Sequence, residues 1–330
     1  MARRILVTGG AGFIGSHLVA ALVARGDECV VFDNLSTGHR AAVPPGLRLI
    51  EADLADRGAV DAALADGRWD AVFHFAALSL VGESMRDPLG YLVANTGNGL
   101  RLIEACIRHG VPHFVLSSTA ALFGTAGAAP IDEAAAIDPG SPYGESKWML
   151  ERALLWAGRV HGLRHAVLRY FNAAGADPDG RLGEDHRPET HLIPLAIDAA
   201  LGRRPPLSVF GGDYATPDGT CIRDYVHVTD LADAHLLALD RLRQGSVTYH
   251  LGSAAGHSVL DVLRAVERVG GRTVPHRLAP RRPGDPAVLV AASGRISRET
   301  GWAPRFAALD EIVATAWRWR LAHPHGYGTA

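Results

Sequence analysis

The chain has few cysteines and no excess of either charge. Its 330 residues include only three cysteines, which are scattered and form no CxxC pair: Cys29, Cys106 and Cys221. An odd, scattered set argues against a disulfide framework and a structural zinc site, and it favours a reducing compartment. Because the formal net charge is only -2, bulk charge gives no reason to expect a nucleic acid or an anionic membrane as partner.

Long hydrophobic runs are also missing. The apolar run at residues 5–7 is too short for the core of a signal peptide, and no stretch approaches the length of a transmembrane helix. We therefore expect a cytoplasmic protein with no membrane partner. Because 48% of the residues are hydrophobic, a chain of this length can still bury a large core.

Short apolar runs alternate with longer helical patterns through the first half of the chain. The expected strands are residues 4–8, 28–33, 47–53, 70–76, 113–118 and 165–171. The expected helices are residues 13–25, 57–65, 91–109 and 142–161. This alternation predicts an α/β fold with a doubly wound, Rossmann-like parallel sheet, whose ligands bind at the carboxyl ends of the strands.

A glycine-rich turn, TGGAGFIG, follows the first expected strand. Gly9, Gly12 and Gly15 lie three residues apart, where glycine permits a tight turn and a close approach of the backbone to a pyrophosphate. A tight turn without a ligand would contain the same glycines. Asp33 favours the ligand, because an acidic residue that ends the second strand can accept hydrogen bonds from both ribose hydroxyls of an adenosine. Since its carboxylate would repel a 2′-phosphate, we expect NAD rather than NADP.

Two further acidic or polar positions follow the second and third strands. Asn34 is a plausible neighbour of the same ribose. Asp53 ends the third strand before Leu54 and could reach the adenine edge. The alternative for Asp53 is a helix N-cap, which is nearly as common for an acidic residue in this position.

The rhythm of the sequence changes near residue 172. Connectors rich in glycine and proline, short strands and separated helices follow. We therefore predict an NAD-binding domain over residues 1–172 and a smaller α/β domain over residues 173–330. Residues 223–242 look like a strand and a helix that return to the first domain.

The stretch SPYGESK places a tyrosine one helical turn before a lysine. If Pro142 lies in the first turn of a helix, Tyr143 and Lys147 project from one face, with Cβ atoms about 5–6 Å apart. A nearby ammonium would lower the pKa of the phenol and make it a usable base near neutrality. An exposed helix face would contain the same pair without function. Thr119 argues against that, because it ends the fifth strand at the same edge of the sheet, and the three groups would form a proton relay for oxidising a secondary alcohol.

These residues resemble the extended short-chain dehydrogenases/reductases. The runs FGGDYATPDGTCIRDYVHVTDLADAH (210–235), FHFAALSLVGES, LRYFNAAGA, ETHLIP and RRPGD closely resemble the UDP-glucose 4-epimerases of that family, from about residue 4 to residue 327. The resemblance implies interconversion of UDP-glucose and UDP-galactose on tightly bound NAD. Tyr143 would take the proton of the 4-hydroxyl, Thr119 would hydrogen-bond the 4-oxygen, and Lys147 would also hold the nicotinamide ribose. The 4-keto sugar would turn over and be reduced on its other face.

The resemblance also implies the remaining contacts, with UDP-sugar as substrate, no metal, and a homodimer as the common assembly. The cofactor-binding residues would be Gly9, Gly12, Phe13, Ile14, Gly15, Asp33, Asn34, Asp53, Leu54, Phe75, Ala76, Ala77, Asn95, Tyr143, Lys147 and Tyr170. The substrate-binding residues would be Thr119, Phe171, Asn172, His191, Leu192, Phe210, Arg223, Arg282 and Asp285. Arg223 and Arg282 also suit a diphosphate chemically, because guanidinium groups match phosphate oxygens.

Three positions depart from the family pattern. Phe123 replaces a common tyrosine and lacks its hydroxyl. Ser79 replaces a lysine that some members use near the cofactor. Leu289 occupies the position that admits or excludes N-acetylated sugars, and its intermediate size leaves their use open.

Other functions remain to be weighed. A 4,6-dehydratase would need an acid and a base after Thr119, but Ala120 and Ala121 cannot transfer protons. A 4-epimerase of UDP-pentoses or UDP-uronates stays open. A module that senses NAD without catalysis is disfavoured, since it would not need Tyr143 or Lys147.

Overall fold

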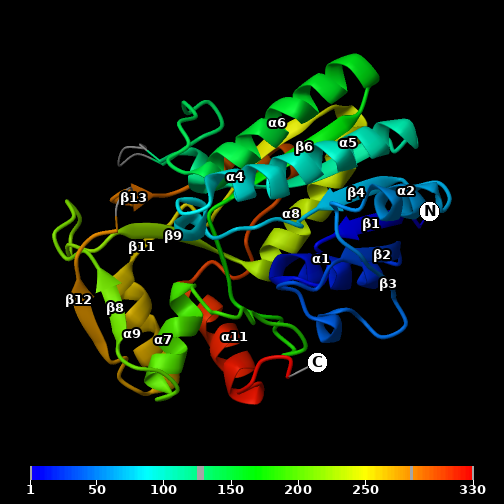
Figure 1. The fold of residues 1–330 in the computed structure, drawn as a ribbon. Coiled ribbons are helices and arrows are strands. Elements are labelled where there is room, and N and C mark those ends of the chain that lie inside the picture. Colours follow the sequence, from blue (N-terminus) through cyan, green and yellow to red (C-terminus); the bar gives the residue numbers. More distant parts are fainter. Residues whose placement is uncertain (1, 125–129, 283–284, 329–330) are drawn as a thin grey trace.

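The computed structural model describes residues 2–124, 130–282 and 285–328 (Figure 1). A large parallel sheet with helices on both faces forms one part of the molecule, and shorter strands with three helices form the other. Pro283 and Gly284 of the RRPGD motif lie outside the described residues. Among the described helices, none combines the length and the apolar character needed to cross a membrane.

The large sheet has the strand order β10-β6-β5-β4-β1-β2-β3, and its neighbouring strands run parallel. This confirms the doubly wound sheet. The order reverses between β1 and β4, which is where such a sheet opens a crevice at its carboxyl edge. The strands are β1 Arg4–Thr8, β2 Glu28–Asp33, β3 Arg48–Glu51, β4 Ala71–His74, β5 His113–Thr119, β6 Arg164–Tyr170 and β10 Val247–Leu251.

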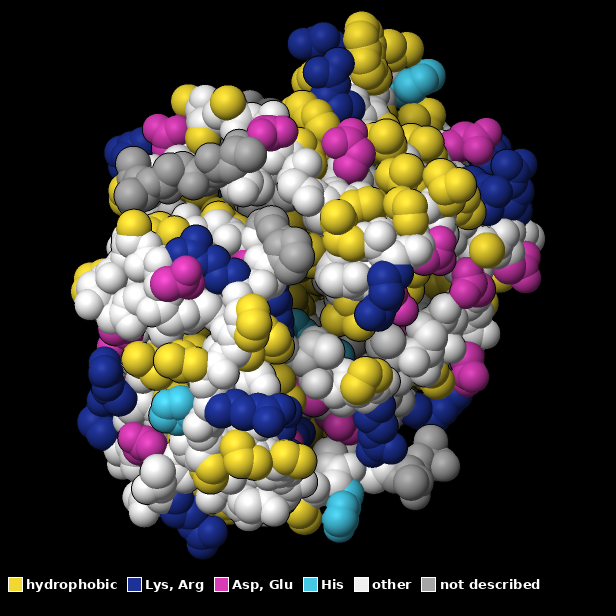
Figure 2. All heavy atoms as spheres, turned by 60° about the vertical axis from the view of Figure 1, so that its left-hand side comes forward, with side chains coloured by type: hydrophobic (Ala, Val, Ile, Leu, Met, Phe, Trp, Pro, Cys, Tyr) yellow, Lys and Arg dark blue, Asp and Glu magenta, His cyan; other side chains and the backbone are white. Residues whose placement is uncertain are grey.

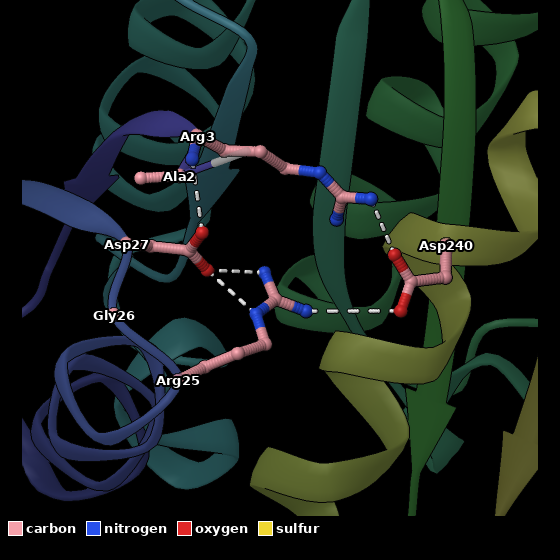
Figure 3. A pocket seen from close by; sticks show the side chains of 6 residues that line it. All are labelled: Ala2, Arg3, Arg25, Gly26, Asp27 and Asp240. Atoms are coloured by element: carbon pink, nitrogen blue, oxygen red, sulfur yellow. Dashed lines mark hydrogen bonds and ion pairs between the residues drawn. The ribbon is translucent and has the colours of Figure 1, made fainter.

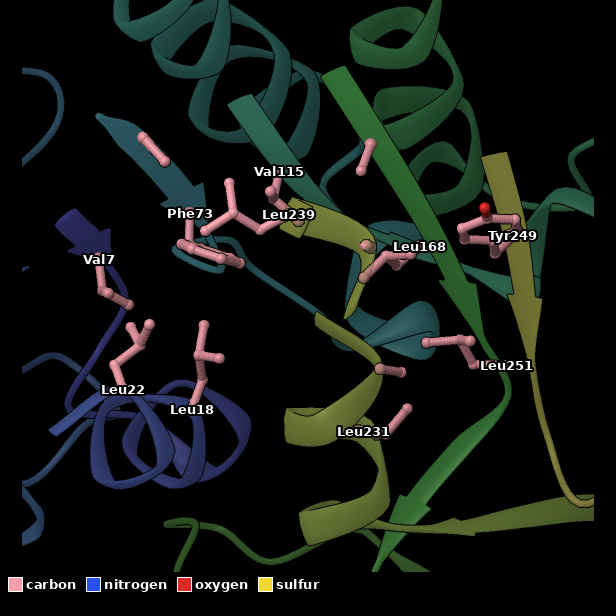
Figure 4. Close-up of a cluster of buried hydrophobic side chains, with 14 of the residues drawn as sticks. Val7, Leu18, Leu22, Phe73, Val115, Leu168, Leu231, Leu239, Tyr249 and Leu251 are labelled. Carbon is pink, nitrogen blue, oxygen red and sulfur yellow. The ribbon is translucent and has the colours of Figure 1, made fainter. Parts of the chain in front are cut away.

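Helices cover both faces of this sheet because its strands are apolar on both sides. On one face lie α1 Phe13–Ala24 and α8 Val228–Arg241. Figure 4 shows Leu18 and Leu22 of α1 and Leu231 and Leu239 of α8 beside sheet residues such as Phe73. The opposite face packs against α2 Arg57–Ala65, α5 Asn98–Arg108 and α6 Pro142–His161.

The expected helix at residues 91–109 is three consecutive pieces. It consists of α4 Pro88–Tyr91, a π-helical segment Leu92–Gly97 and α5. A short helix, α3 Val81–Ser84, precedes them. The π-helical segment carries Asn95, and π turns inside helices are frequent at functional sites.

The segment 223–242 returns to the large sheet only in part. Helix α8 packs beside α1, whereas β9 Ile222–His227 pairs with strands of a smaller sheet, so the expectation of a returning strand is wrong. Its neighbours there are β7 Asn172–Ala174, β11 Gly256–Ser258 and β13 Val288–Leu289. The strand that completes the large sheet is β10, which the sequence interpretation missed.

The rest of the second half builds a separate apolar core. Strand β8 Leu207–Phe210 pairs in parallel with β12 His276–Ala279. Helices α7 Leu192–Ala200, α9 Val259–Gly270 and α11 Leu309–Ala322 pack together over these strands, while α10 Gly294–Thr300 lies against β10. The division of the chain into two domains near residue 172 stays a prediction.

Candidate active site

The glycine turn after β1 accepts only glycine at two positions. Gly9 has a φ of +73°, and a Cβ on it would lie 2.4 Å from the backbone nitrogen of Ala76. A Cβ on Gly15 would lie 2.1 Å from the carbonyl oxygen of Gly9. Gly12 is the N-cap residue of α1, and no side chain caps this helix. The first-turn N–H groups, including those of Phe13 and Ile14, therefore stay available to an anion, which fits the pyrophosphate of a dinucleotide.

Asp33 ends β2 beside this turn. Its carboxylate is buried and accepts hydrogen bonds from the backbone N–H groups of Ala11 and Leu35, both at 2.9 Å. Burial raises the pKa of Asp33, and the two N–H groups oppose this effect. Each carboxylate oxygen can accept a further hydrogen bond, so this placement suits the ribose hydroxyls that the sequence predicts.

A second acidic residue, Asp53, follows β3 and is bonded by the side chain of Asn34. The side-chain amide of Asn34 donates to Asp53 Oδ2 at 2.7 Å. The N–H of Ala55, and after it Asn34, lower the pKa of Asp53. The alternative of a helix cap at Asp53 is wrong, since Asp56 caps α2. Leu54, next in the chain, is buried.

The loop after β4 lies directly on the glycine turn. The N–H groups of Phe75 and Ala76 both donate to the carbonyl of Thr8, at 2.9 and 3.2 Å. These residues and Ala77 thus lie between β1 and β4, where the strand order reverses. Asn95 fixes the far end of the loop, because it bonds both the N–H and the carbonyl of Leu78, at 2.8 and 2.9 Å. Its second amide hydrogen goes to Ser146 at 3.0 Å, so Asn95 joins this loop to α6, and its contact with the cofactor stays a prediction.

Tyr143 lies in the first turn of α6. The Ser141 hydroxyl caps the helix by accepting from Gly144 N, and Pro142 occupies the first turn as expected. Burial raises the pKa of Tyr143, and a hydrogen bond with Thr119 at the end of β5 opposes the rise. The structure therefore brings the predicted phenol and hydroxyl together.

Lys147 is one turn further along α6 and is only 1% exposed. Its Nζ atom donates to the carbonyl of Ser117 at 3.0 Å. Burial lowers the pKa of Lys147 to about 8, and the carboxylate of Glu151 partly opposes this. We expected Lys147 to lower the pKa of Tyr143. In the protein alone that expectation is wrong, because burial dominates and the pKa of Tyr143 is raised.

Sequence analysis missed a buried network behind Lys147. Glu151 accepts from Arg169 through two nitrogens, Nε at 3.0 Å and Nη2 at 2.6 Å, and it also accepts from the hydroxyl of Ser118. The sequence did contain a signal for Glu151, because this residue follows Lys147 by four residues and so shares its helix face. Tyr170, at the end of β6, shares a hydrogen bond with the hydroxyl of Ser117, and burial raises its pKa.

Two predicted substrate residues meet in the smaller sheet, at β9 and the segment before β13. Arg223 of β9 forms an ion pair with Asp285, and its side chain is 13% exposed. Leu289 of β13 is its partner in strand register. Asn172 of β7 donates to the carbonyl of Asp224 at 2.8 Å, which places it one residue from Arg223.

Other predicted substrate residues come from neighbouring segments. The guanidinium of Arg282 lies over the ring of Phe210, 4.1 Å from its centroid. Phe171 and Leu289 pack against a small cluster that contains Phe123. Phe123 is only 2% exposed, and its ring lies 5.2 Å from that of His250.

His191 and Leu192 lie at the start of α7. His191 is the N-cap residue, and its Nδ1 atom is 2.8 Å from Glu184 and 3.2 Å from Glu189. Leu192 packs partly into the core of the second half. In that same segment His186 lies against Phe13, with ring centroids 6.4 Å apart, so residues 184–192 border the glycine turn.

The figures show two hollows in the surface of the molecule. Figure 2 shows a hollow near the middle of the face it draws, between the two parts of the molecule. A separate pocket lies where β1 and β2 begin, at the edge opposite the glycine turn. Figure 3 shows that its two arginines are paired with carboxylates. This pocket is lined by Ala2, Arg3, Arg25, Gly26, Asp27 and Asp240.

Comparison with known proteins agrees with this geometry. Residues 5–252 match the model of the NAD dependent epimerase/dehydratase family. The UDP-glucose 4-epimerase of Streptococcus mutans is 49% identical over 98% of this chain and 98% of its own. The UDP-glucose 4-epimerase of Brucella ovis, solved in complex with NAD, is 44% identical with a TM-score of 0.92, over 96% of this chain and 98% of its own. The UDP-glucose 4-epimerase of Bifidobacterium longum, solved with NAD+ and UDP, is 34% identical with a TM-score of 0.93, over 98% of this chain and 99% of its own. The chain therefore belongs to the NAD dependent epimerase/dehydratase family.

Proposed function

We propose that the chain interconverts UDP-glucose and UDP-galactose, as an NAD-dependent isomerase that oxidises C4 of the sugar and reduces it again. The observation that carries the proposal is the meeting of Tyr143 and Thr119 at the carboxyl edge of the sheet, where no side chain caps the start of α1. The similarity to UDP-glucose 4-epimerases over nearly the whole chain supports it. Three buried cysteines without a disulfide support the cytoplasm as its compartment.

The residues around the glycine turn would hold the cofactor. The free N–H groups at the start of α1 suit its pyrophosphate, and Asp33 suits its adenosine ribose. The ammonium of Lys147 donates one hydrogen bond to the carbonyl of Ser117. Two of its N–H donors therefore remain for the nicotinamide ribose. When bound, NAD supplies the acceptor and then the donor of a hydride.

Tyr143 would act as the base that takes the proton from the 4-hydroxyl and later returns it. Thr119 shares a hydrogen bond with the phenol and can hold the 4-oxygen of the sugar at the same time. Because burial raises the pKa of Tyr143, its phenolate needs positive charge beside it to form near neutrality. The ammonium of Lys147 and a cationic nicotinamide are the charges that this site would provide.

Residues of β9, β8 and the segment before β13 would hold the nucleotide. Arg223 and Arg282 would neutralise the diphosphate, while Asp285 would bind the ribose of the UMP part. Phe210, which lies under Arg282, would contact the uracil. Asn172 and His191 would complete the contacts to the diphosphate and the sugar.

A product assay tests the proposal. The purified protein is examined for bound NAD and then incubated with UDP-galactose, UDP-N-acetylgalactosamine or UDP-arabinose. We expect UDP-glucose to form from UDP-galactose. Turnover of UDP-arabinose alone would instead favour the pentose alternative, and bound NAD without any turnover would favour a sensing module. The position of Leu289 beside Arg223 makes UDP-N-acetylgalactosamine the informative comparison for sugar size.

We also propose that the chain forms a homodimer. Helices α5 and α6 lie side by side (Figure 1) and expose apolar side chains that a monomer rarely gathers on one surface. Hydrophobic side chains also collect in the upper part of Figure 2. We propose that a second copy covers these residues: Leu100, Met149, Leu155, Trp156 and Val160. Light scattering should give a dimer for the native chain and a monomer for Trp156→Glu, while Leu278→Glu, at an exposed position on β12, should leave the dimer intact.

A further inference from the structure

The segment that leads into α7 carries a cluster of four potential metal ligands. Its residues are Glu184, His186, Glu189 and His191, and one donor atom from each lies within 4.8 Å of all the others. The two pairs share one spacing, since each histidine follows a glutamate by two residues. In extended backbone this spacing points both side chains of a pair to the same side.

Asp185, between Glu184 and His186, makes its contacts outside the cluster and anchors the segment. The carboxylate of Asp185 accepts from the N–H of Tyr327 at 3.0 Å, and its carbonyl bonds the ring of His39 at 2.9 Å. The segment is thus fixed from its outer side. The imidazole and carboxylate groups of the cluster are held together by the fold around them.

Distances within the cluster match the edges of a metal coordination sphere. His186 Nδ1 lies 3.4 Å from Glu184 Oε1 and 3.6 Å from Glu189 Oε2. His191 Nδ1 lies 2.8 Å from Glu184 and 3.2 Å from Glu189. Bonds of about 2.0–2.2 Å to a tetrahedral ion place its ligands roughly 3.3–3.6 Å apart. Three of the four separations are close to this value.

Among these four approaches, only that of His191 to Glu189 is a hydrogen bond. Glu184 Oε1, His186 Nδ1 and Glu189 Oε2 are buried, and none of them makes a hydrogen bond within the part of the chain that the structure describes. Glu184 is only 5% exposed. These atoms face one another as ion pairs, and an ion at the point where they converge would bind all of them.

We propose that Glu184, His186, Glu189 and His191 bind one divalent transition-metal ion of the zinc class. Imidazole nitrogens suit zinc and its neighbours, whereas calcium and magnesium prefer sites built from oxygen. The two carboxylates balance the charge of the ion. Since His186 packs against Phe13 at the start of α1, the ion ties the entry to α7 onto the nucleotide-binding helix.

The test measures metal binding in the full-length protein, purified without a histidine tag and assayed without nucleotide sugar. We expect about one zinc per chain by elemental analysis. After removal of the metal by a chelator, Co²⁺ should bind with the same stoichiometry and give the visible absorption of a tetrahedral site. Thermal unfolding should then move to higher temperature as the free Zn²⁺ concentration rises.

Variants separate a metal site from a cluster of ion pairs. His186→Gln and Glu189→Gln should each weaken Co²⁺ binding by more than the about 10–100-fold that loss of an outer partner of a metal ligand costs. His161→Gln, at an exposed position that ends α6, should bind as the native chain does. Native protein that binds neither metal, or binds both unchanged in the two variants, would overturn the proposal. Because no sugar is present, either result leaves the proposed function to its own assay.

Discussion

The guanidinium of Arg169 donates to both carboxylate oxygens of Glu151, through Nε and Nη2. Both side chains are almost fully buried, 6% and 5% exposed. Glu151 stands one helical turn after Lys147 and also accepts from Ser118 on β5. The pair therefore joins α6 to the strands β5 and β6 directly behind the proposed proton relay. It holds in place the helix that carries Tyr143 and Lys147.

Removing the charge of Glu151 should destabilise the protein. In Glu151→Gln the guanidinium of Arg169 stays buried without its counter-charge, and breaking a buried pair in this way costs about 3–5 kcal/mol. Chemical unfolding measures the loss. Glu104→Gln, at an exposed position on α5, is the control and should change stability by less than about 0.5 kcal/mol. Equal stabilities of the two variants would show that the pair contributes little.

Tyr143→Phe should separate binding from chemistry. The variant keeps the ring that packs in the site but has no hydroxyl to accept the proton of the sugar. We expect kcat to fall by at least the ~10²-fold typical of general acid–base catalysis, with bound NAD retained. Turnover and cofactor content of the same preparation decide the matter. Turnover near that of the native chain would refute the role of Tyr143 as base.

Lys147 should make stability depend on pH in a defined range. Its pKa in the folded protein is about 8, lowered from 10.5 by burial. Between these values the unfolded chain binds the proton and the folded chain does not, so this residue adds stability as the pH rises. Below about pH 8 its burial cost is fully present. Relative to Lys147→Met, the native chain should therefore gain up to about 1.4 kcal/mol per pH unit from pH 8 to 10.5, as measured by unfolding of both proteins across this range. A constant difference would contradict the lowered pKa.

Asp33 should decide which dinucleotide the chain carries. Its carboxylate lies where the adenosine ribose is expected and would repel a 2′-phosphate. Mass spectrometry of the cofactor released from the native protein should therefore find NAD(H) and not the phosphorylated form. Asp33→Asn keeps an acceptor but removes the charge, and we expect this variant to discriminate less between the two. Recovery of the phosphorylated form from the native chain would show that Asp33 does not select the cofactor.

The hydrogen on C4 should not exchange with water during the reaction. If it leaves as hydride and returns within one closed site, epimerisation in heavy water gives a product without deuterium at C4. Proton NMR of the product measures this directly. Extensive deuterium at C4 would require removal of a proton from carbon, and the mechanism proposed for Tyr143 would be wrong.

The first half of the fold could be predicted because its signals are local. Strands β1 and β2 begin and end at the expected residues, since each is an apolar run bounded by a glycine turn or an acidic residue. Helix α6 also spans the expected residues, because Ser141 and Pro142 start it and Gly162, with a φ of +73°, ends it. For the site, the spacing from Tyr143 to Lys147 placed both residues correctly on one helix.

Features that depend on contacts between residues far apart in the sequence could not be predicted from local patterns. Strand β10 is an ordinary short strand in the sequence, and only its pairing with β6 shows that it belongs to the large sheet. The pKa of Tyr143 was expected to fall because Lys147 is near. Its direction is set instead by burial, which depends on elements far away in the chain. The partner of Glu151, Arg169, lies on strand β6, 18 residues further along the chain, and leaves no local signal.

The outermost position of β10 and the packing of α8 against α1 have a consequence for the order of folding during synthesis. The sheet that would hold the dinucleotide cannot close its seventh position until residue 251 has left the ribosome, because β10 Val247–Leu251 comes so late in the chain. The amino-terminal half must therefore wait, with one edge of its sheet and part of one face uncovered, until residues 228–251 have been translated.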